Sequence, residues 1–362
     1  MTARRDYLAL TRLHGISQSM ATTLVKELGS IDEILKNVET LPIKIRNAFQ
    51  EGWTKACERA EQELDFCEKK NIQILIPEND NYPQRLKECN DAPLALFYKG
   101  TANLNKRHII SVVGTRHISE YGKDICHNFI NELKTLIPDC MIVSGLAYGV
   151  DIHAHRASIS SNMETVGVLA HGLDRIYPHL HRNTAIEMMQ QGGLLTEYMT
   201  GTNPDKGNFV RRNRIVAGMS DATVVVESAH KGGALITAHL ANDYAREVFA
   251  FPGRIHDEFS EGCHQLIKSN KAALITCAKD LTENMGWDVS TNAPTPIQRE
   301  LFPELSDEET LLCELLKGSD GMAVNQLVVK SNLPFANVSV LLFELEMKGV
   351  VKAMPGGNFR LL

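Results

Sequence analysis

The chain has 362 residues, of which 43% are hydrophobic and 23% charged, and its formal net charge at pH 7 is −6. The length exceeds that of one ordinary core, and the composition is typical of a globular protein with two or three domains. The acidic balance excludes a generally basic nucleic-acid binder, so affinity for a polyanion would have to come from a local patch. No run of about 18 apolar residues and no signal-peptide pattern occurs. We therefore expect a cytoplasmic protein with no membrane span.

Residues 1–70 carry apolar side chains at helical spacing, interrupted by Gly15 and Gly29. This pattern predicts a small domain of several short helices and a longer helix from about residue 55 to residue 70. The segment Leu13-His-Gly-Ile-Ser17 resembles the turn of a helix-hairpin-helix or SAM-like domain, whose backbone amides can hold a phosphate. Ser17 stands where a second glycine is usual, and such hairpins are often structural. Both a DNA contact and a structural turn stay open for this module.

Residues 75–287 begin with an extended segment and a connecting stretch marked by Pro83, Pro93 and Gly100. From residue 108, short β-branched apolar runs alternate with segments of helix length, which predicts an α/β domain with a Rossmann-like parallel sheet core. The expected strands are 109–113, 141–143, 165–169, 194–196, 222–226 and 247–251. In such sheets, ligands bind beyond the carboxyl ends of the strands.

Glycine-containing turns follow four of these expected strands. Glycine lets a backbone approach a phosphate, and the first amides of a helix are unpaired donors with a positive partial charge. These turns therefore predict an anion-binding edge. Its predicted phosphate- or backbone-binding residues are Gly114, Thr115, Ser144, Gly145, Gly172, Ser228, Lys231, Gly232, Gly233 and Thr237.

The segment Lys206–Gly218 concentrates positive charge in an otherwise acidic chain. Within nine residues it carries four cations, no carboxylate and one large aromatic, Phe209. A loop of this kind suits single-stranded nucleic acid, whose phosphates meet the cations and whose bases stack on the ring. The alternative is a solvated charged loop that leads into a helix. The predicted strand-binding residues are Arg116, Lys206, Phe209, Arg211, Arg212 and Arg214, although Arg212 and Arg214 could equally brace neighbouring loops.

Enzymatic interpretations find less support in the sequence. The Gly-x-Gly-x-x-Gly turn of a dinucleotide dehydrogenase is absent after the first strand. His153 and His155 fall at a helix start, where residues two apart point to different faces, so we expect these histidines and His171 to pack or cap rather than bind metal. The eight scattered cysteines form no Cys-x-x-Cys pair and predict reduced core residues.

The leading enzymatic alternative is a Rossmann-like nucleotide hydrolase. Glu197 and Glu227 lie at strand ends, as the carboxylates of a phosphoribohydrolase would. That family, however, carries a Pro-Gly-Gly-x-Gly-Thr turn before a helix. This chain has Lys231-Gly-Gly-Ala-Leu-Ile-Thr237 at the comparable place and so lacks the full motif.

Six motifs, spread over about 145 residues, together resemble one family. They are Val113-Gly-Thr-Arg116, Ile142-Val-Ser-Gly-Leu-Ala-Tyr-Gly-Val-Asp-Ile-His-Ala-His155, Gly172-Leu-Asp-Arg-Ile-Tyr-Pro178, Arg212-Asn-Arg-Ile-Val-Ala-Gly218, Gly233-Ala-Leu-Ile-Thr-Ala238 and Glu247-Val-Phe-Ala-Phe-Pro-Gly253. Their order and spacing are similar to those of the DNA-processing protein A (DprA/Smf) family. The likeness runs from about residue 75 to residue 280, because Asn81-Tyr-Pro-Gln-Arg-Leu86 resembles the family's lead-in.

The resemblance implies a non-enzymatic protein without cofactor or metal that binds incoming single-stranded DNA during natural transformation. It implies three partners besides the strand: the RecA recombinase, the single-strand-binding protein it displaces, and a second copy bound through the Rossmann-like domain. The family's pocket residues map onto Arg116, Lys206 and Phe209. Val210, where proline is frequent, and Gly233-Ala234, where Gly-Ser is frequent, are mild departures.

A polar, proline-containing linker is expected at residues 288–305, followed by a winged helix at 306–362. Ser306 and Glu309 form a capping-box pattern, two further helices are expected at 323–330 and 335–348, and residues 350–362 predict a hairpin. The presumed recognition helix carries Glu344 and Glu346 against Lys348, which repels phosphate. We expect this domain to dock a protein or regulate the core rather than read duplex DNA.

Overall fold

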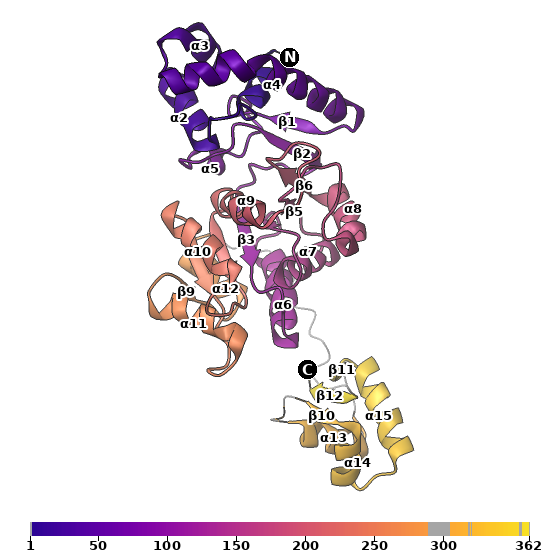
Figure 1. Cartoon of the computed structure of the whole chain (residues 1–362). Coiled ribbons are helices and arrows are strands. Elements are labelled where there is room, and N and C mark those ends of the chain that lie inside the picture. The colour runs from indigo at the N-terminus through magenta and orange to yellow at the C-terminus, as the bar shows by residue number, and fades with distance from the viewer. Residues whose placement is uncertain (1, 289–304, 318, 320, 355–356, 362) are drawn as a thin grey trace. The chain divides into compact units, whose positions relative to one another are not determined.

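The computed structural model describes residues 2–288, 305–317, 319, 321–354 and 357–361 (Figure 1). It divides into two compact units, residues 1–292 and 293–362. The linker expected at 288–305 falls almost entirely outside the described residues. The expected boundary near residues 70–75, between the helical domain and the sheet domain, lies inside the first unit and stays a prediction.

The N-terminal part of the first unit is helical, as its apolar periodicity predicts. It contains α1 (Thr2–Leu10), α2 (Gln18–Leu28), α3 (Ile31–Lys36), the 3-10 helix η1 (Val38–Thr40) and α4 (Ile43–Lys69). The hydroxyls of Ser17 and Ser30 accept hydrogen bonds from backbone amides in the first turns of α2 and α3, and so fix where these helices begin. The prediction that the long helix begins near residue 55 was wrong. It starts at Ile43, because buried Ile45 and Phe49 extend its apolar face by three turns.

A nine-stranded sheet with the order β1-β2-β6-β5-β4-β3-β7-β8-β9 forms the centre of the first unit. The strands are β1 (Gln73–Leu75), β2 (Leu96–Gly100), β3 (Ile109–Val113), β4 (Met141–Ser144), β5 (Thr165–Val168), β6 (Gly193–Thr196), β7 (Ala222–Val225), β8 (Glu247–Ala250) and β9 (Ala273–Leu274). From β6 to β9 all neighbours are parallel, which confirms the Rossmann-like fold and all six expected strands. The stretch expected to be a connection holds the antiparallel strand β2, which lies between Pro93 and Gly100 and pairs with β1 and β6.

Helices cover both faces of this sheet. They are α5 (Gln84–Lys87), α6 (Glu120–Leu136), α7 (Val150–Ser160), η2 (His179–His181), α8 (Arg182–Gln191), α9 (Lys206–Gly218), α10 (Gly233–Asp243), η3 (Glu258–Ser260), α11 (Glu261–Lys268) and α12 (Ala278–Asn284). Alternate residues of each strand face opposite layers: Ile109 and Val113 pack with α9, α10 and α11, whereas Ile110 and Val112 pack with α6, α7 and α12.

The N-terminal helices share a core with the β1–β2 edge of the sheet (Figure 1). Ile74 and Phe97 from the sheet edge and Met199 from the segment after β6 pack among the side chains of these helices. Polar contacts add to this packing: one Arg59 nitrogen donates to Glu63 (2.8 Å) and to the Thr200 carbonyl (2.8 Å). The N-terminal helices are therefore fixed against the sheet within one compact unit.

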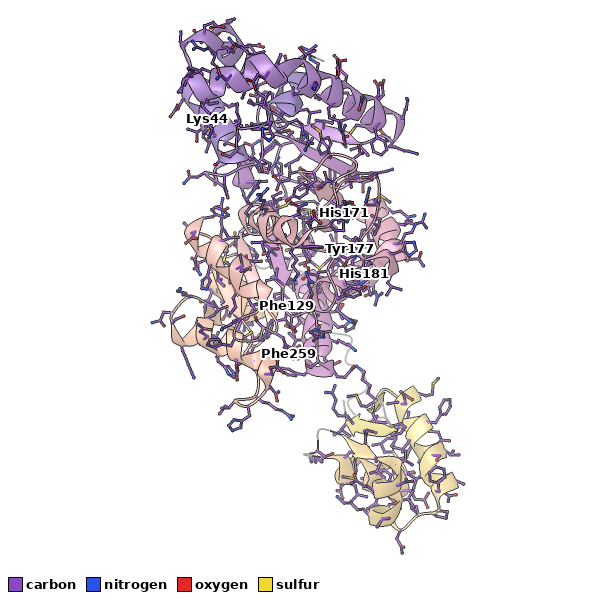
Figure 2. The ribbon with its side chains drawn as sticks, viewed as in Figure 1. Lys44, Phe129, His171, Tyr177, His181 and Phe259 are labelled. Atoms are coloured by element: carbon purple, nitrogen blue, oxygen red, sulfur yellow. The ribbon has the colours of Figure 1, made fainter. Side chains whose placement is uncertain are left out.

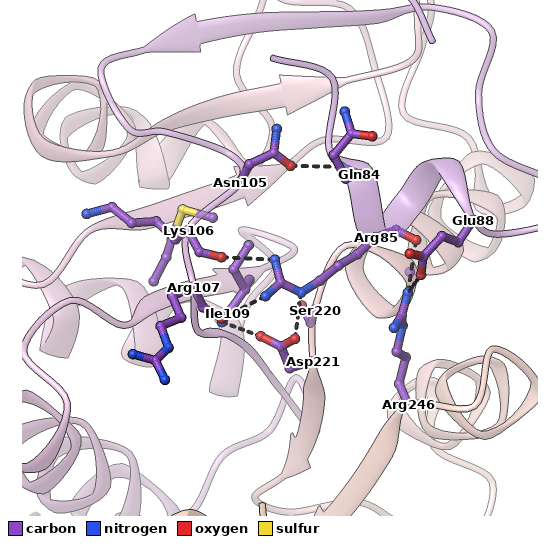
Figure 3. Close-up of polar contacts among 12 residues, drawn as sticks. Gln84, Arg85, Glu88, Asn105, Lys106, Arg107, Ile109, Ser220, Asp221 and Arg246 are labelled. Atoms are coloured by element: carbon purple, nitrogen blue, oxygen red, sulfur yellow. Dashed lines mark hydrogen bonds and ion pairs between the residues drawn. The ribbon is translucent and has the colours of Figure 1, made fainter. Parts of the chain in front are cut away.

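Hydrogen bonds from Arg85 connect helix α5 to the amino ends of β3 and β7 (Figure 3). The Arg85 guanidinium donates to Asp221 (2.6 Å) and to the carbonyls of Lys106 and Arg107. The second Asp221 oxygen accepts the Ile109 amide (2.8 Å), so one carboxylate joins the starts of β3 and β7. This network holds the end of the sheet opposite the glycine turns.

The second unit has the elements of the expected winged helix. It contains α13 (Asp307–Leu316), β10 (Met322–Ala323), α14 (Val324–Ser331), α15 (Phe335–Met347), β11 (Val351–Met354) and β12 (Asn358–Leu361), with β12 paired to both other strands. The capping box of Ser306 and Glu309 is present. Across the described residues no single helix is long and apolar enough to span a membrane; the bent pair of α14 and α15 meets that test only by length and composition.

The outer surface of α15 carries exposed apolar side chains. Val340, Phe343 and Met347 are exposed at helical spacing, which leaves an apolar stripe on this helix. Lys348 donates to both carboxylate oxygens of Glu309 (2.7 and 2.8 Å), so its charge is largely offset. The expectation that this domain docks a protein stays a prediction.

Candidate nucleic-acid interface

A cavity of about 560 Å³ opens beyond the carboxyl ends of the central strands. Its wall includes the turn after β3, from Gly114 to Arg116, and the turn after β7, at Gly232 and Gly233. β3 and β7 are neighbours from which the chain order runs in opposite directions across the sheet. This is the switch point at which open α/β sheets bind their ligands. We call it the rim cavity.

The aromatic ring of Phe209 is the centre of one wall of the rim cavity. The Arg116 guanidinium carbon lies 5.3 Å from the ring centroid and that of Arg212 lies 6.0 Å away. The Tyr177 ring is 5.9 Å from the Phe209 ring at an angle of 55°. Lys206, which is exposed at the start of α9, lines the same cavity. The structure thus brings Arg116, Lys206 and Phe209 together at one site.

The segment 206–218 is the helix α9, so the expectation of a basic loop was wrong. The apolar run Ile215-Val-Ala-Gly218 is buried against the sheet and anchors the last turn of a helix that starts at Lys206. A helix turns its side chains through 100° per residue, so the four cations cannot all face one ligand. They separate into two pairs with different surroundings.

Arg212 and Arg214 are buried, and both have internal partners. Arg212 Nη1 donates to the carbonyls of Gly145 (2.5 Å) and Val168, and so braces the turns after β4 and β5. Arg214 Nη2 donates to Glu197 (2.5 Å). Of the two roles left open for these arginines, the structure shows the bracing one. Arg212 still lines the floor of the rim cavity, whereas Arg214 and Arg211 line a different cavity and are removed from the rim set.

The predicted turn residues also divide into two groups. Gly114, Thr115, Gly145, Gly232, Gly233 and Thr237 line the rim cavity. Ser144, Gly172, Ser228 and Lys231 do not line it. Ser144 is buried and donates to the Val112 carbonyl (2.6 Å), and the buried Ser228 donates to the Ala229 carbonyl (3.1 Å). The two serines therefore shape the turns from inside.

The two glutamates of the hydrolase alternative lie outside the rim cavity. Glu227 accepts hydrogen bonds from the backbone amide of Ser119 (2.9 Å) and from its hydroxyl, at the start of α6. Glu197 is held by Arg214 and by Gln18 of the N-terminal helices. Both carboxylates are thus engaged in holding structural elements, and neither faces a nucleotide placed in the rim cavity.

The histidines act in packing and loop support. His155 lies on α7, where its Nδ1 contacts the Thr165 hydroxyl (2.7 Å), and burial lowers its pKa to about 3. His171 Nε2 accepts the Tyr177 amide (3.2 Å), so this histidine holds the loop that carries Tyr177 (Figure 2). Among the residues that the structure describes, no group of three or more His, Cys, Asp or Glu side chains could hold a metal ion.

Tyr177 and Asp151 line the rim cavity and were missed as site residues. Tyr177 is 46% exposed and offers a second ring beside Phe209. Asp151 accepts the amides of Gly145 (3.1 Å) and Ala147 (3.3 Å) and shapes the turn after β4. Burial raises the pKa of Asp151, and the nearby Arg212 charge opposes that rise. An aromatic residue in a loop that follows a buried strand was the available signal for Tyr177.

The fold and the rim cavity define a Rossmann-like protein with a C-terminal winged helix. The model of the DNA recombination-mediator protein A family matches residues 73–286, and that of the DprA winged helix domain matches residues 294–357. The chain therefore belongs to the DNA recombination-mediator protein A family, as its six motifs indicate, and is a DNA-processing protein of that family.

Similar proteins cover nearly the whole chain. Protein Smf of Escherichia coli is 32% identical over 98% of this chain and 94% of its own length, and a putative DNA processing protein DprA of Mycobacterium tuberculosis is 33% identical over 97% and 93%. The structure is similar to that of DNA processing protein A from Streptococcus pneumoniae, with a TM-score of 0.62 and 31% identity over 77% of this chain and 97% of that one.

A second similar solved structure is that of a relative whose ligand is stated. It is DNA processing protein A from Helicobacter pylori, described for its single-stranded DNA binding mode. The TM-score is 0.53 and the identity 28%, over 59% of this chain and 95% of that one.

Proposed function

We propose that this protein binds single-stranded DNA in the rim cavity, protects it, and loads the RecA recombinase on it during natural transformation and recombination in the cytoplasm. The observation that carries the proposal is the convergence of Arg116, Lys206 and Phe209 on one cavity at the switch point of the sheet. The Helicobacter pylori relative, described as binding single-stranded DNA, supports the same ligand class.

The chemistry of the cavity fits a flexible polynucleotide. Arg116 and Lys206 form no ion pair with any described residue, so their charges are available to phosphates. The α10 helix begins at Gly233 on the cavity wall, where the positive partial charge of its first turn favours an anion. Phe209 and Tyr177 offer faces for stacking, which every base can use, so sequence preference is slight. In this role the protein is a carrier of the strand and not an enzyme.

Loading RecA requires the strand to be handed over, and we propose that a homodimer formed through the Rossmann-like domain does this while displacing single-strand-binding protein. The outer edge of the sheet supports such an assembly. β9 is the last strand of the sheet, Leu274 on it is 48% exposed and the nearby Ile255 is 80% exposed. Edge strands with exposed apolar side chains favour pairing with another chain. Light scattering of the full chain measures this assembly directly.

The test of strand binding is a fluorescence-anisotropy titration with an oligothymidylate at two salt concentrations. Phe209→Ala removes a stacking face, so we expect binding to lose about 1–3 kcal/mol of free energy with little change in its salt dependence. Arg116→Ala and Lys206→Ala each remove a phosphate partner, so the slope of log affinity against log salt decreases by about 0.7. The matched control is Lys44→Ala, an exposed lysine of α4 that does not line the rim cavity (Figure 2).

If the titration curves stay unchanged for all three variants, the rim cavity is not the strand-binding site. The loading step is tested separately, by measuring RecA filament formation on a strand coated with single-strand-binding protein. We expect the protein to accelerate filament formation and Phe209→Ala to abolish most of the acceleration. A protein that binds the strand but leaves filament formation unchanged would retain the first half of the proposal and lose the second.

A further inference from the structure

A second cavity, of about 640 Å³, lies between helix α9 and the N-terminal hairpin. It is lined on the α9 side by Asn208, Arg211 and Arg214, which recur at every third position and so share one face of the helix. The rim cavity uses another face of the same helix, through Phe209 and Asn213. One helix therefore separates two cavities. We call the second one the hairpin cavity.

The opposite wall of the hairpin cavity is the turn that resembles a helix-hairpin-helix. Arg12, Ser17 and Ser19 line it, and α2 begins beside them with Ser17 as its N-cap. The start of this 11-residue helix adds a positive partial charge, and its Met20 amide is already bonded to the Ser17 hydroxyl (3.2 Å). Gln18 bonds to Glu197, and the Thr22 hydroxyl donates to the Ala92 carbonyl (3.2 Å), so the wall is held against the sheet domain.

The residues that line the floor of the hairpin cavity include a buried ion pair with two atoms that have no hydrogen-bond partner. Arg214 is only 8% exposed, and its Nη1 has no hydrogen-bond partner although Nη2 bonds to Glu197. The Oε1 atom of Glu197, whose side chain is 3% exposed, is also without a partner. Buried donors and acceptors are almost always paired, and leaving them unpaired is costly. Both atoms are shielded from solvent, so the ion pair supports the cavity from beneath and is not part of the surface that a ligand would touch.

The charges at the mouth fit a phosphate. Arg12 and Arg211 are exposed, and neither side chain is paired with any residue that the structure describes. The arginines that line the cavity are Arg12, Arg211 and Arg214, and the carboxylates are Asp91 and Glu197. Three positive charges against two negative ones leave a net charge of +1, which suits one phosphodiester with its base rather than a long run of phosphates.

We propose that the hairpin cavity is a second subsite for the same strand that the rim cavity binds, an inference that rests on the proposed function. A strand that leaves the rim cavity crosses the exposed side of α9, whose width of about 10–12 Å separates the two sites. Arg211 and Arg12 then hold a phosphate at the mouth, above the buried ion pair of Arg214 and Glu197. The N-terminal module thereby lengthens the binding path and gives it a fixed direction.

The test compares oligothymidylates of about 4 and about 16 nucleotides, which bracket ordinary single-strand sites. The variants are Arg12→Gln and Arg211→Gln, and both remove an exposed charge without opening a core. For the long oligonucleotide we expect the double variant to lose affinity and its slope of log affinity against log salt to decrease by about 0.7, because both arginines hold one phosphate. For the short oligonucleotide, which the rim cavity alone accommodates, we expect no change. Lys44→Gln is the matched control and should change neither titration.

Two further outcomes separate this inference from the function on which it rests. Suppose the double variant binds both lengths as the wild type does, while Phe209→Ala weakens both. The hairpin subsite is then wrong and the rim site stands. If Phe209→Ala and Lys206→Ala also leave both titrations unchanged, the proposed function and the subsite fall together. Equal weakening at both lengths would likewise overturn the subsite, because it would indicate general electrostatic attraction instead of a place on the strand's path.

Discussion

The two halves of helix α9 both carry positively charged side chains, but in opposite surroundings. In the first half, Lys206 is exposed, and Phe209 is half-buried beside Arg116 on the wall of the rim cavity. In the second half, Arg212 and Arg214 are buried and bonded to Gly145, Val168 and Glu197. The first half lines the rim cavity, whereas the second half connects helix and sheet.

This difference shows that a cluster of cations in sequence is not a cluster of available charge. Burying a charge is costly unless partners compensate for it, and Arg212 and Arg214 have such partners in strand-end carbonyls and a carboxylate. Arg212 keeps the turns after β4 and β5 in the positions that form the cavity, and Arg214 holds Glu197 after β6. The exposed half can then present its ring and its lysine on a rigid support.

The largest effect on stability is expected from Arg214→Met, which removes the buried ion pair between α9 and Glu197. The change leaves the Glu197 carboxylate, 3% exposed, without its cation. Removing one partner of a buried ion pair costs about 3–5 kcal/mol. We expect urea denaturation to show a loss of this order in the free energy of unfolding. The double variant Glu197→Gln with Arg214→Met should recover much of it, and a single variant as stable as the wild type would mean that the pair contributes nothing.

The fold was largely predictable from the sequence, because strand runs such as Ile109–Val113 and Ala222–Val225 are short, β-branched and separated by segments of helix length. The meeting of Arg116 with Phe209 followed from strand ends sharing one edge. The partition of the four cations was not predicted, because it depends on the helical phase of α9. The buried apolar run that ends this helix was the signal for that phase. The strand β2 was missed because its pairing partner β6 is distant in sequence and local pattern does not reveal it.

A smaller effect on stability is expected from two glycines that line the rim cavity but differ in the space around them. A methyl group on Gly145 would overlap the Arg212 guanidinium, whereas one on Gly233 would meet nothing within 4 Å. Overpacking typically costs about 1–3 kcal/mol, so Gly145→Ala should lower the free energy of unfolding by that amount. Gly233→Ala, which reduces only the freedom of the unfolded chain, should be neutral or raise it by about 0.4–1 kcal/mol. Similar unfolding curves for the two variants would show that Arg212 is free to move.

Low pH should reduce the stability of the folded chain through His155, which is buried on α7 near Arg212. Burial, followed by the Arg212 charge, lowers the pKa of this histidine from 6.5 to about 3 in the folded chain. Between those values the unfolded chain binds a proton that the folded chain refuses, so stability is full above pH 6.5 and falls with decreasing pH by up to about 1.4 kcal/mol per pH unit. Urea denaturation at several pH values should give a slope smaller by that amount in His155→Gln. Parallel pH dependences for the two proteins would show that His155 can be protonated in the folded state.

The smallest effect on stability is expected on the exposed half, from Lys206→Gln. Substitutions at exposed positions away from caps and cores usually change the free energy of unfolding by no more than about 0.5 kcal/mol, and Lys206 is exposed in the first turn of its helix. A cation near a helix start is slightly unfavourable, so the change can even stabilise the chain. The same variant should decrease the salt dependence of strand binding by about 0.7. Unfolding and binding measured on one preparation thus separate the two halves of α9: Arg214→Met acts first on folding, and Lys206→Gln acts on binding alone. A loss of stability for Lys206→Gln as large as that for Arg214→Met would make the whole helix structural and leave the rim cavity without its positive wall.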